Sequence, residues 1–211
     1  MYRAITVARE YGSGGGTIAA RLAARLGWDL IDNSLITQVA QAANVDPEVC
    51  HECDERVDSW FHRLNKSTFG LGVFEGVAVG DVFDADAMAS LTRKMIEEAA
   101  HQGNVVIVGR AAQCILQGRP DVFHTFVYAP MEDRIRRIRE KFGSAFATPA
   151  RIEEQDRLRA QYVEYYYKCD WRHVHLYDAL FCSLLGVDTV VSAVLTAMGV
   201  NIQQKDPMQH A

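Results

Sequence analysis

The sequence predicts an α/β fold in which a parallel β-sheet is flanked by helices. Three short runs of apolar, largely β-branched residues are typical of strands that are covered on both faces, as buried parallel strands are. Segments with a helical period lie between and after these runs, and a glycine-rich loop directly follows the first of them. Strands that alternate with helices imply one parallel sheet with right-handed crossovers.

The predicted strands are short and lack a polar face. They cover Ile5 to Ala8, Val105 to Val108 and His124 to Tyr128. A further short strand is expected from Trp28 to Asp32, with Asp32 at its carboxyl end. These segments are spaced widely enough for helical crossovers to connect them.

The predicted helices carry apolar residues every three or four positions, which places those residues on one face. This pattern covers Thr17 to Leu26, Met88 to His101 and Met131 to Phe142. The last of these has a strongly basic outer face. Its first turn is acidic and its later turns are basic, which suits the helix dipole without any function. The alternative is that Arg134, Arg137 and Arg136 flank an active-site phosphate.

A glycine-rich loop connects the first strand to the first helix. In such a turn, successive backbone N–H groups can converge on an anion, and the positive end of the following helix adds to the attraction. The sequence therefore predicts a phosphate-binding loop made of Gly12, Ser13, Gly14, Gly15, Gly16 and Thr17.

This loop departs from the phosphate-binding pattern G-x-x-x-x-G-K-[ST], in which the lysine supplies a positive charge to the transferring phosphates. With the last glycine of the pattern aligned on Gly14, Arg9 replaces the first glycine and Gly15 replaces the lysine. Gly16 replaces the Ser/Thr, and Thr17 follows one position later. We interpret the loop as a nucleotide site with altered chemistry.

Arginines follow two other predicted elements. Arg110 comes just after the strand Val105 to Val108, and open α/β sheets bind ligands at the carboxyl ends of their strands. Its planar guanidinium can engage two anionic oxygens at once, although a surface arginine would fit the same pattern. Arg157 and Arg159 lie in a segment that can form a lid over a bound nucleotide, excluding water and bringing positive charge to the migrating phosphoryl group.

Residues 44–86 differ in character from the rest of the chain. An acidic stretch is followed by an apolar stretch that glycines interrupt and that keeps neither a strand nor a helix period. Two interpretations stay open: a mobile insert that covers the acceptor, and an irregular edge segment or oligomer contact. We otherwise expect a single domain over residues 1–211, with the lid at residues 143–172.

Composition excludes several classes of protein. The formal net charge is −5, and nonspecific nucleic-acid affinity needs many Lys and Arg contacts to phosphates. No apolar run approaches the length that spans a membrane. The five cysteines are odd in number and irregularly spaced, and the pair Cys50 and Cys53 lacks the partners that a zinc site requires. We expect a cytoplasmic protein with reduced thiols, no nucleic-acid or membrane partner, and a small-molecule ligand.

Together these motifs resemble the cytidylate kinase-like family, which belongs to the P-loop nucleoside monophosphate kinases. The resemblance extends from Tyr2 to about Met198, and the opening R-E-Y-G-S-G-G is its most specific part. The other matching segments are Ile31-Asp32, Val106 to Ala112, Tyr128-Ala129-Pro130, Arg134, and Asp156 to Trp171. Two positions depart from bacterial cytidylate kinases: Ala111 replaces an aspartate, and Gln38 stands near the place of an arginine that binds the acceptor phosphate.

The resemblance implies a role for each group of residues. Residues 12–17 would bind the ATP phosphates, and the Thr17 hydroxyl would be a ligand of Mg²⁺. Asp32 and Arg110 would lie on the acceptor side, and Arg157 and Arg159 would come from the lid. The charge of the missing lysine would come from Arg9 or Arg157.

Two functions from different classes follow. The first is a kinase that transfers the γ-phosphate of ATP to a nucleoside monophosphate, with CMP as the preferred acceptor. The second is a nucleotide-binding protein that has lost catalysis and acts as a sensor or a partner-binding module, as the missing lysine and Ala111 suggest. A different small acceptor on the same fold is a third possibility. The chain is also a candidate homo-oligomer.

Overall fold

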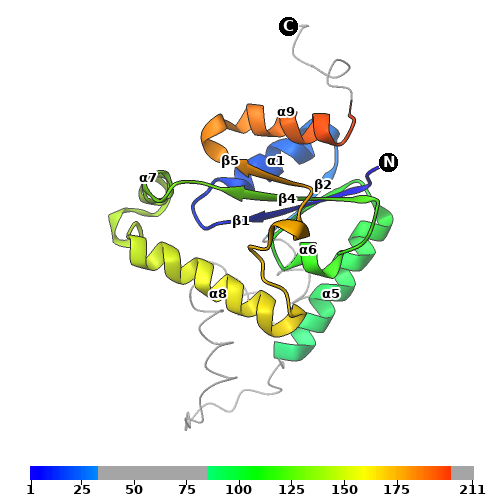
Figure 1. Cartoon of the computed structure of the whole chain (residues 1–211), viewed down its shortest axis with the longest axis horizontal. Coiled ribbons are helices and arrows are strands. Elements are labelled where there is room, and N and C mark those ends of the chain that lie inside the picture. The colour runs from blue at the N-terminus through cyan, green and yellow to red at the C-terminus, as the bar shows by residue number, and fades with distance from the viewer. Residues whose placement is uncertain (33–84, 201–211) are drawn as a thin grey trace, which may run out of the picture.

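The fold is a five-stranded parallel sheet with helices on both faces, which confirms the predicted class (Figure 1). A computed structural model describes residues 1–32 and 85–200. Nearly all of the predicted insert at residues 44–86 lies outside the described residues, as do Gln38, Cys50 and Cys53. No helix among the described residues is long and apolar enough to cross a membrane.

The strands are ordered β2-β3-β1-β4-β5 across the sheet. The central strand β1 (Ala4–Arg9) pairs in parallel with β3 (Val105–Val108) on one side and β4 (Val122–Tyr128) on the other. The outer strands are β2 (Asp29–Ile31) and β5 (Ala179–Cys182). The chain therefore passes over β1 on its way from β3 to β4, and the carboxyl ends of β1 and β3 meet at the same edge of the sheet.

Among the described residues, two helices cover one face of the sheet and three cover the other. Helices α1 (Gly15–Leu26) and α9 (Val187–Ala197) pack on the face that carries Ile5 and Val7 of β1. The opposite face, with Ala4 and Ala8, packs against α5 (Ala85–Gln102), α6 (Ala112–Ile115) and α8 (Pro149–Tyr167). Figure 1 shows these layers above and below the strands. Because both faces are covered, β1 is mostly apolar and has no alternating polar face.

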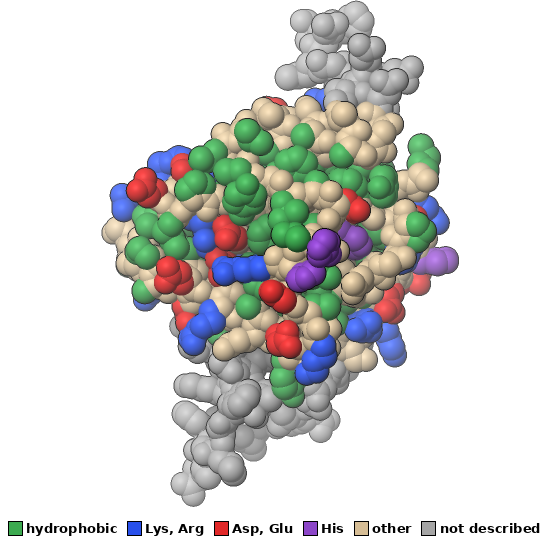
Figure 2. Space-filling view, in the orientation of Figure 1, with side chains coloured by type: hydrophobic (Ala, Val, Ile, Leu, Met, Phe, Trp, Pro, Cys, Tyr) green, Lys and Arg blue, Asp and Glu red, His purple; other side chains and the backbone are tan. Residues whose placement is uncertain are grey.

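The remaining described elements surround the carboxyl edge of the sheet and the path into β5. Helix α7 (Met131–Phe142) follows β4 and has the bounds that the sequence predicted. Three short 3₁₀ helices complete the fold: η1 (Ser144–Phe146), η2 (Val174–Leu176) and η3 (Ser183–Leu185). On the face of the molecule drawn in Figure 2, hydrophobic side chains gather over β5 and α9. Exposed large side chains of β5 and η3 include Leu180, Leu184 and Leu185.

Strand β3 lies inside the sheet, between β2 and β1. Pro149 begins α8, where its missing N–H costs nothing and Thr148 caps the first turn by accepting from the Arg151 N–H at 3.4 Å. Strand β5 was not predicted from the sequence, since Ala-Leu-Phe-Cys lacks β-branched residues and its side chains are half-buried or exposed.

Candidate functional site

The glycine-rich loop joins the end of β1 to the start of α1 at the carboxyl edge of the sheet. Gly12 and Gly14 have φ angles of +78° and +84°, a left-handed conformation that favours glycine. A Cβ on Gly12 would also lie 3.0 Å from the Arg134 carbonyl oxygen. The first turn of α1 contains no acidic residue, so the positive end of the helix is not neutralised from within. The loop therefore has the geometry of an anion site.

Arg9 occupies the space beside the loop where a side chain at position 15 would begin. A Cβ built on Gly15 would lie 2.6 Å from the Arg9 Cβ. The far end of the same side chain reaches the end of β3, since a Cβ on Gly109 would lie only 1.8 Å from Arg9 Nη1. Arg9 therefore extends from Gly15, the first residue of α1, to Gly109, which directly follows β3. Because both residues are glycines, they leave room for the Arg9 side chain.

Three arginines gather where β1 and β3 end. Protein atoms packed around the Arg9 guanidinium, followed by the charges of Arg159 and Arg110, lower the pKa of Arg9 to about 9, although Asp32 opposes this shift. Burial likewise lowers the pKa of Arg159, with Arg134 and Arg110 adding to the effect and Asp156 opposing it. Like charges held this closely in a partly dry site favour an anionic ligand, because such a ligand would relieve their repulsion.

The structure brings together most, but not all, of the predicted site residues. Arg9, Arg110, Arg159 and Asp32 are close enough to influence one another electrostatically. Thr17 lies in the exposed first turn of α1 with Gly16. Arg157 lies on the exposed side of α8, where it pairs with Glu154 at Nε–Oε2 2.8 Å, and does not join the cluster. The lid prediction covers α8, whose Tyr162 and Val163 pack on Ala8 and Phe126 of the sheet.

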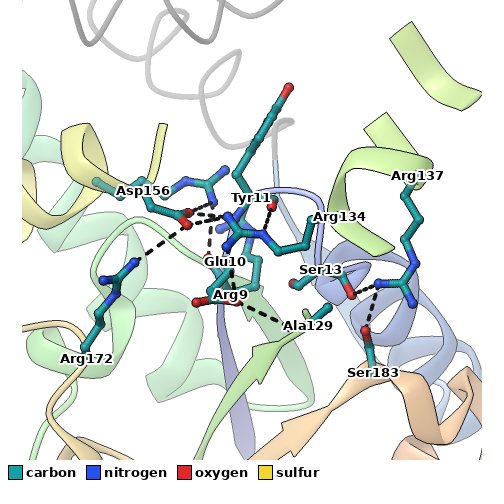
Figure 3. A network of polar contacts seen from close by, with 11 residues as sticks. Arg9, Glu10, Tyr11, Ser13, Ala129, Arg134, Arg137, Asp156, Arg172 and Ser183 are labelled. Carbon is teal, nitrogen blue, oxygen red and sulfur yellow. Dashed lines mark hydrogen bonds and ion pairs between the residues drawn. The ribbon is translucent and has the colours of Figure 1, made fainter. Parts of the chain in front are cut away.

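Guanidinium groups also hold the backbone of the loop, as Figure 3 shows for Arg134 and Arg137. Arg134 Nε donates to the Tyr11 carbonyl at 2.7 Å, and Arg137 Nη1 donates to the Ser13 carbonyl and to Ser183 Oγ, both at 2.8 Å. Arg159 Nη1 donates to the Arg9 carbonyl at 3.2 Å. Carbonyls at positions 9, 11 and 13 are thus all bound by arginines.

Sequence reasoning did not identify these arginine contacts, or their acidic partners. Arg134 is only 5% exposed, although the basic pattern of its helix is typical of a solvated face. Its Nη1 lies 3.4 Å from Glu10 Oε2, which also accepts from the Ala129 N–H at 3.2 Å. The sequence offered only general signals: Arg134 and Asp156 belong to segments that carry the family resemblance, and Arg134 and Arg137 were candidates to flank a phosphate.

A magnesium site built from protein side chains alone is not found in the described part of the chain. No group of three His, Cys, Asp or Glu residues there is placed to hold a metal ion. The Thr17 hydroxyl is exposed at the anion end of α1, which fits a metal that is bound mostly through phosphate oxygens and water.

Comparison with known proteins identifies the class of this fold and site. The model of the cytidylate kinase-like family matches residues 4–184, and the chain belongs to that family. No curated protein sequence matches it.

Solved structures share the fold at low sequence identity. An uncharacterized protein from Eubacterium ventriosum ATCC 27560 is similar with a TM-score of 0.68 and 20% identity, over 95% of this chain and 100% of that one. Shikimate kinase from Acinetobacter baumannii, in complex with shikimate, has a TM-score of 0.53 and 13% identity, covering 97% of each chain. A gluconokinase from Sinorhizobium meliloti 1021 has a TM-score of 0.53 and 14% identity, over 93% of this chain and 91% of that one.

Proposed function

We propose that this protein is an ATP-dependent kinase that transfers the γ-phosphate to a nucleoside monophosphate, with CMP as the preferred acceptor. The observation that carries the proposal is the position of the arginine cluster. Arg9 and Arg110 lie beside Gly109 at the end of β3, and Arg9 also contacts the first residue of α1 at the anion loop. Positive charge therefore lies between a donor-phosphate loop and the adjoining strand end.

On the donor side, residues 12–17 would bind the ATP phosphates through backbone N–H groups and the end of α1. Phosphoryl transfer depends largely on positioning and charge neutralisation, so a general base is not required. Arg9 would supply the charge that a lysine gives in the common loop pattern. Mg²⁺ would be held by the phosphates together with the Thr17 hydroxyl, and would add charge neutralisation when bound.

On the acceptor side, Arg110 and Asp32 would contact the monophosphate nucleotide, and Arg159 would approach from α8. The planar guanidinium of Arg110 suits a phosphate better than a lysine would. Arg157 would act only if the segment around it moves relative to the arrangement described here, since its guanidinium pairs with Glu154. Cytoplasmic residence and homo-oligomer formation remain part of the proposal.

A second function is favoured by the loss of the lysine and by Ala111 after Arg110. On this alternative, the loop binds a nucleotide without catalysis, and the protein acts as a sensor or a partner-binding module. The two functions share the anion site. They differ in whether bound ATP is consumed when an acceptor is present.

The decisive experiment measures ADP formation from MgATP with CMP, UMP, AMP and GMP in turn. We expect turnover that is fastest with CMP and that falls about 100-fold or more in Arg110→Ala and Arg159→Ala, as for loss of a charge-stabilising group. Arg21→Ala is the matched control, because Arg21 is exposed on α1 and, within the described residues, its ion pair is with the exposed Asp188, at Nε–Oδ1 3.5 Å. Nucleotide binding by calorimetry without turnover favours the sensor; absence of binding contradicts both functions.

A further inference from the structure

The buried carboxylate of Asp156 lies against the phosphate loop, and the geometry points to a specific role for it. We propose that Asp156 is a positioning residue that holds the loop around Tyr11 in its anion-binding conformation. The proposal rests on the proposed function only in taking this loop as the donor-phosphate site.

Asp156 is on α8 and is only 2% exposed. Its Oδ1 accepts from the Tyr11 N–H at 2.8 Å and lies 3.6 Å from Arg159 Nη1. Its Oδ2 accepts from Arg134 Nη2 and lies 3.7 Å from Arg172 Nη2. Figure 3 shows this carboxylate facing the guanidinium groups of Arg134 and Arg172. A buried charge is tolerated when it is paired and hydrogen-bonded, and both oxygens of Asp156 meet that condition.

The pair formed by Asp156 and Arg134 binds both backbone groups of Tyr11. Asp156 takes the N–H, and Arg134 Nε donates to the carbonyl at 2.7 Å. The peptide units on either side of Tyr11 are therefore fixed from outside the loop. Gly12 follows directly and begins the left-handed turn, so the direction in which the loop enters that turn is set at Tyr11.

Fixing these peptide units matters because an anion-binding turn works only when its N–H groups already converge. A loop that is ordered before the ligand arrives avoids the entropy cost of ordering on binding. Asp156 also pairs with Arg159, which donates to the Arg9 carbonyl at 3.2 Å. The same carboxylate therefore aligns the loop and one arginine of the cluster.

Two other roles for Asp156 fit the contacts less well. A metal ligand would have to hold its cation among Arg134, Arg159 and Arg172, and their charges would repel it. A general base needs a lone pair directed at the substrate, but both oxygens already face N–H donors of the protein. The contacts therefore favour positioning over direct catalysis.

The test measures amide hydrogen exchange of the full-length protein without any nucleotide. In Asp156→Asn, an amide nitrogen can face Arg134 and the charge is lost, so we expect loop amides 10–14 to exchange about tenfold faster or more. Calorimetry with MgATP should show a dissociation constant raised about tenfold, because part of the binding energy now goes into ordering the loop.

Asp178→Asn is the matched control. Asp178 also accepts a backbone N–H, from His124 at 2.7 Å, but at the other end of β4. It should leave loop exchange and MgATP affinity unchanged. Unchanged loop exchange in Asp156→Asn, or an equal rise in Asp178→Asn, would overturn the proposal.

Arg134→Lys provides a second route if Asp156→Asn fails to fold. The lysine keeps a charge beside Asp156 but cannot bind Asp156 and the Tyr11 carbonyl in the bidentate manner of a guanidinium. Faster loop exchange supports the proposal, and unchanged exchange contradicts it. Absence of MgATP binding by the wild-type protein would count against the proposed function alone, because loop exchange is measured without ligand.

Discussion

The Arg9 side chain occupies the space that a side chain at Gly15 would need. A Cβ built on Gly15 would lie 2.6 Å from the Arg9 Cβ, which is closer than Cβ atoms approach one another in proteins. The residue that replaces the usual lysine must therefore be glycine while Arg9 keeps this position. The change at the lysine site and the arginine at the end of β1 form a single arrangement. The cation is moved from the first turn of α1 to the last residue of β1.

This relationship predicts how restoring the lysine affects stability. Gly15→Lys alone should lower the free energy of unfolding by about 1–3 kcal/mol, because it overpacks the site against Arg9. Arg9→Gly combined with Gly15→Lys should recover much of that loss, giving a coupling that a double-mutant cycle in urea would measure. Additive effects of the two changes would show that the two residues do not share the space.

Gly109 permits a separate test of where the Arg9 guanidinium lies. Gly109→Ala places a Cβ 1.8 Å from Arg9 Nη1 and should displace the guanidinium, lowering kcat/KM about tenfold or more. Gly118→Ala is matched to it, because Gly118 also has a positive φ, +80°, and no described residue other than its chain neighbours lies within 4 Å of its Cβ position. The control should cost about 1 kcal/mol of backbone strain without changing kcat/KM. Equal kinetic effects of the two variants would contradict the assigned position.

Arg134 should be more important for stability than its basic neighbours on α7. Arg134→Met removes the partner of two acidic groups, Glu10 and the buried Asp156, and should cost about 3–5 kcal/mol. Arg136→Ala, on the same helix, breaks only exposed pairs with Asp133 and Glu140 and should stay within about 0.5 kcal/mol. Chemical denaturation would measure both. A loss of similar size in the two variants would contradict a special structural role for the pairing of Arg134 with Glu10 and Asp156.

The lowered pKa of Arg9 predicts a pH dependence of anion binding. Burial and the neighbouring arginine charges lower the pKa of Arg9 to about 9, so we expect affinity for inorganic pyrophosphate to fall as the pH rises through this range. Folding stability should change in the opposite direction. Above about pH 9 the folded protein holds fewer protons at Arg9 than the unfolded chain, so the destabilisation that this group causes at lower pH is progressively relieved as the pH rises. Calorimetric titration with pyrophosphate at a series of pH values, for wild type and for Arg9→Met, would isolate the contribution of Arg9 to affinity. Affinities that depend on pH in the same way in both proteins would contradict the prediction.

Much of the fold followed from local patterns in the sequence. The strand Val105–Val108 and the helix Met131–Phe142 were predicted with their observed bounds. The strand is a continuous apolar run, and the helix carries its apolar residues at helical spacing. Strand β5 was missed because a short, half-exposed run lacks such a pattern. The stretch at residues 44–86 keeps neither a strand nor a helix period, so the sequence did not assign it to an element.

The site was predictable only in outline. The glycine loop and Arg110 follow strands, so their place at the carboxyl edge is a consequence of topology. The partners of the arginines are set by tertiary packing: Arg134 meets Asp156, 22 positions away, and Arg137 meets Ser183 in η3. A periodic basic helix cannot reveal which of its guanidinium groups turn inward. From the sequence, either Arg9 or Arg157 could supply the charge near the loop. The position of Arg9 beside Gly15 and the pairing of Arg157 with Glu154 favour Arg9.

The central claim is that Arg9 supplies the missing charge for phosphoryl transfer. The most direct test is the rate of ADP formation from MgATP and CMP by wild type and by Arg9→Met, with Arg21→Met as control. We predict turnover by wild type and by the control, and a kcat about 100-fold lower or more in Arg9→Met, as expected for loss of one charge that stabilises the transition state. Wild-type turnover that Arg9→Met leaves unchanged would contradict the account.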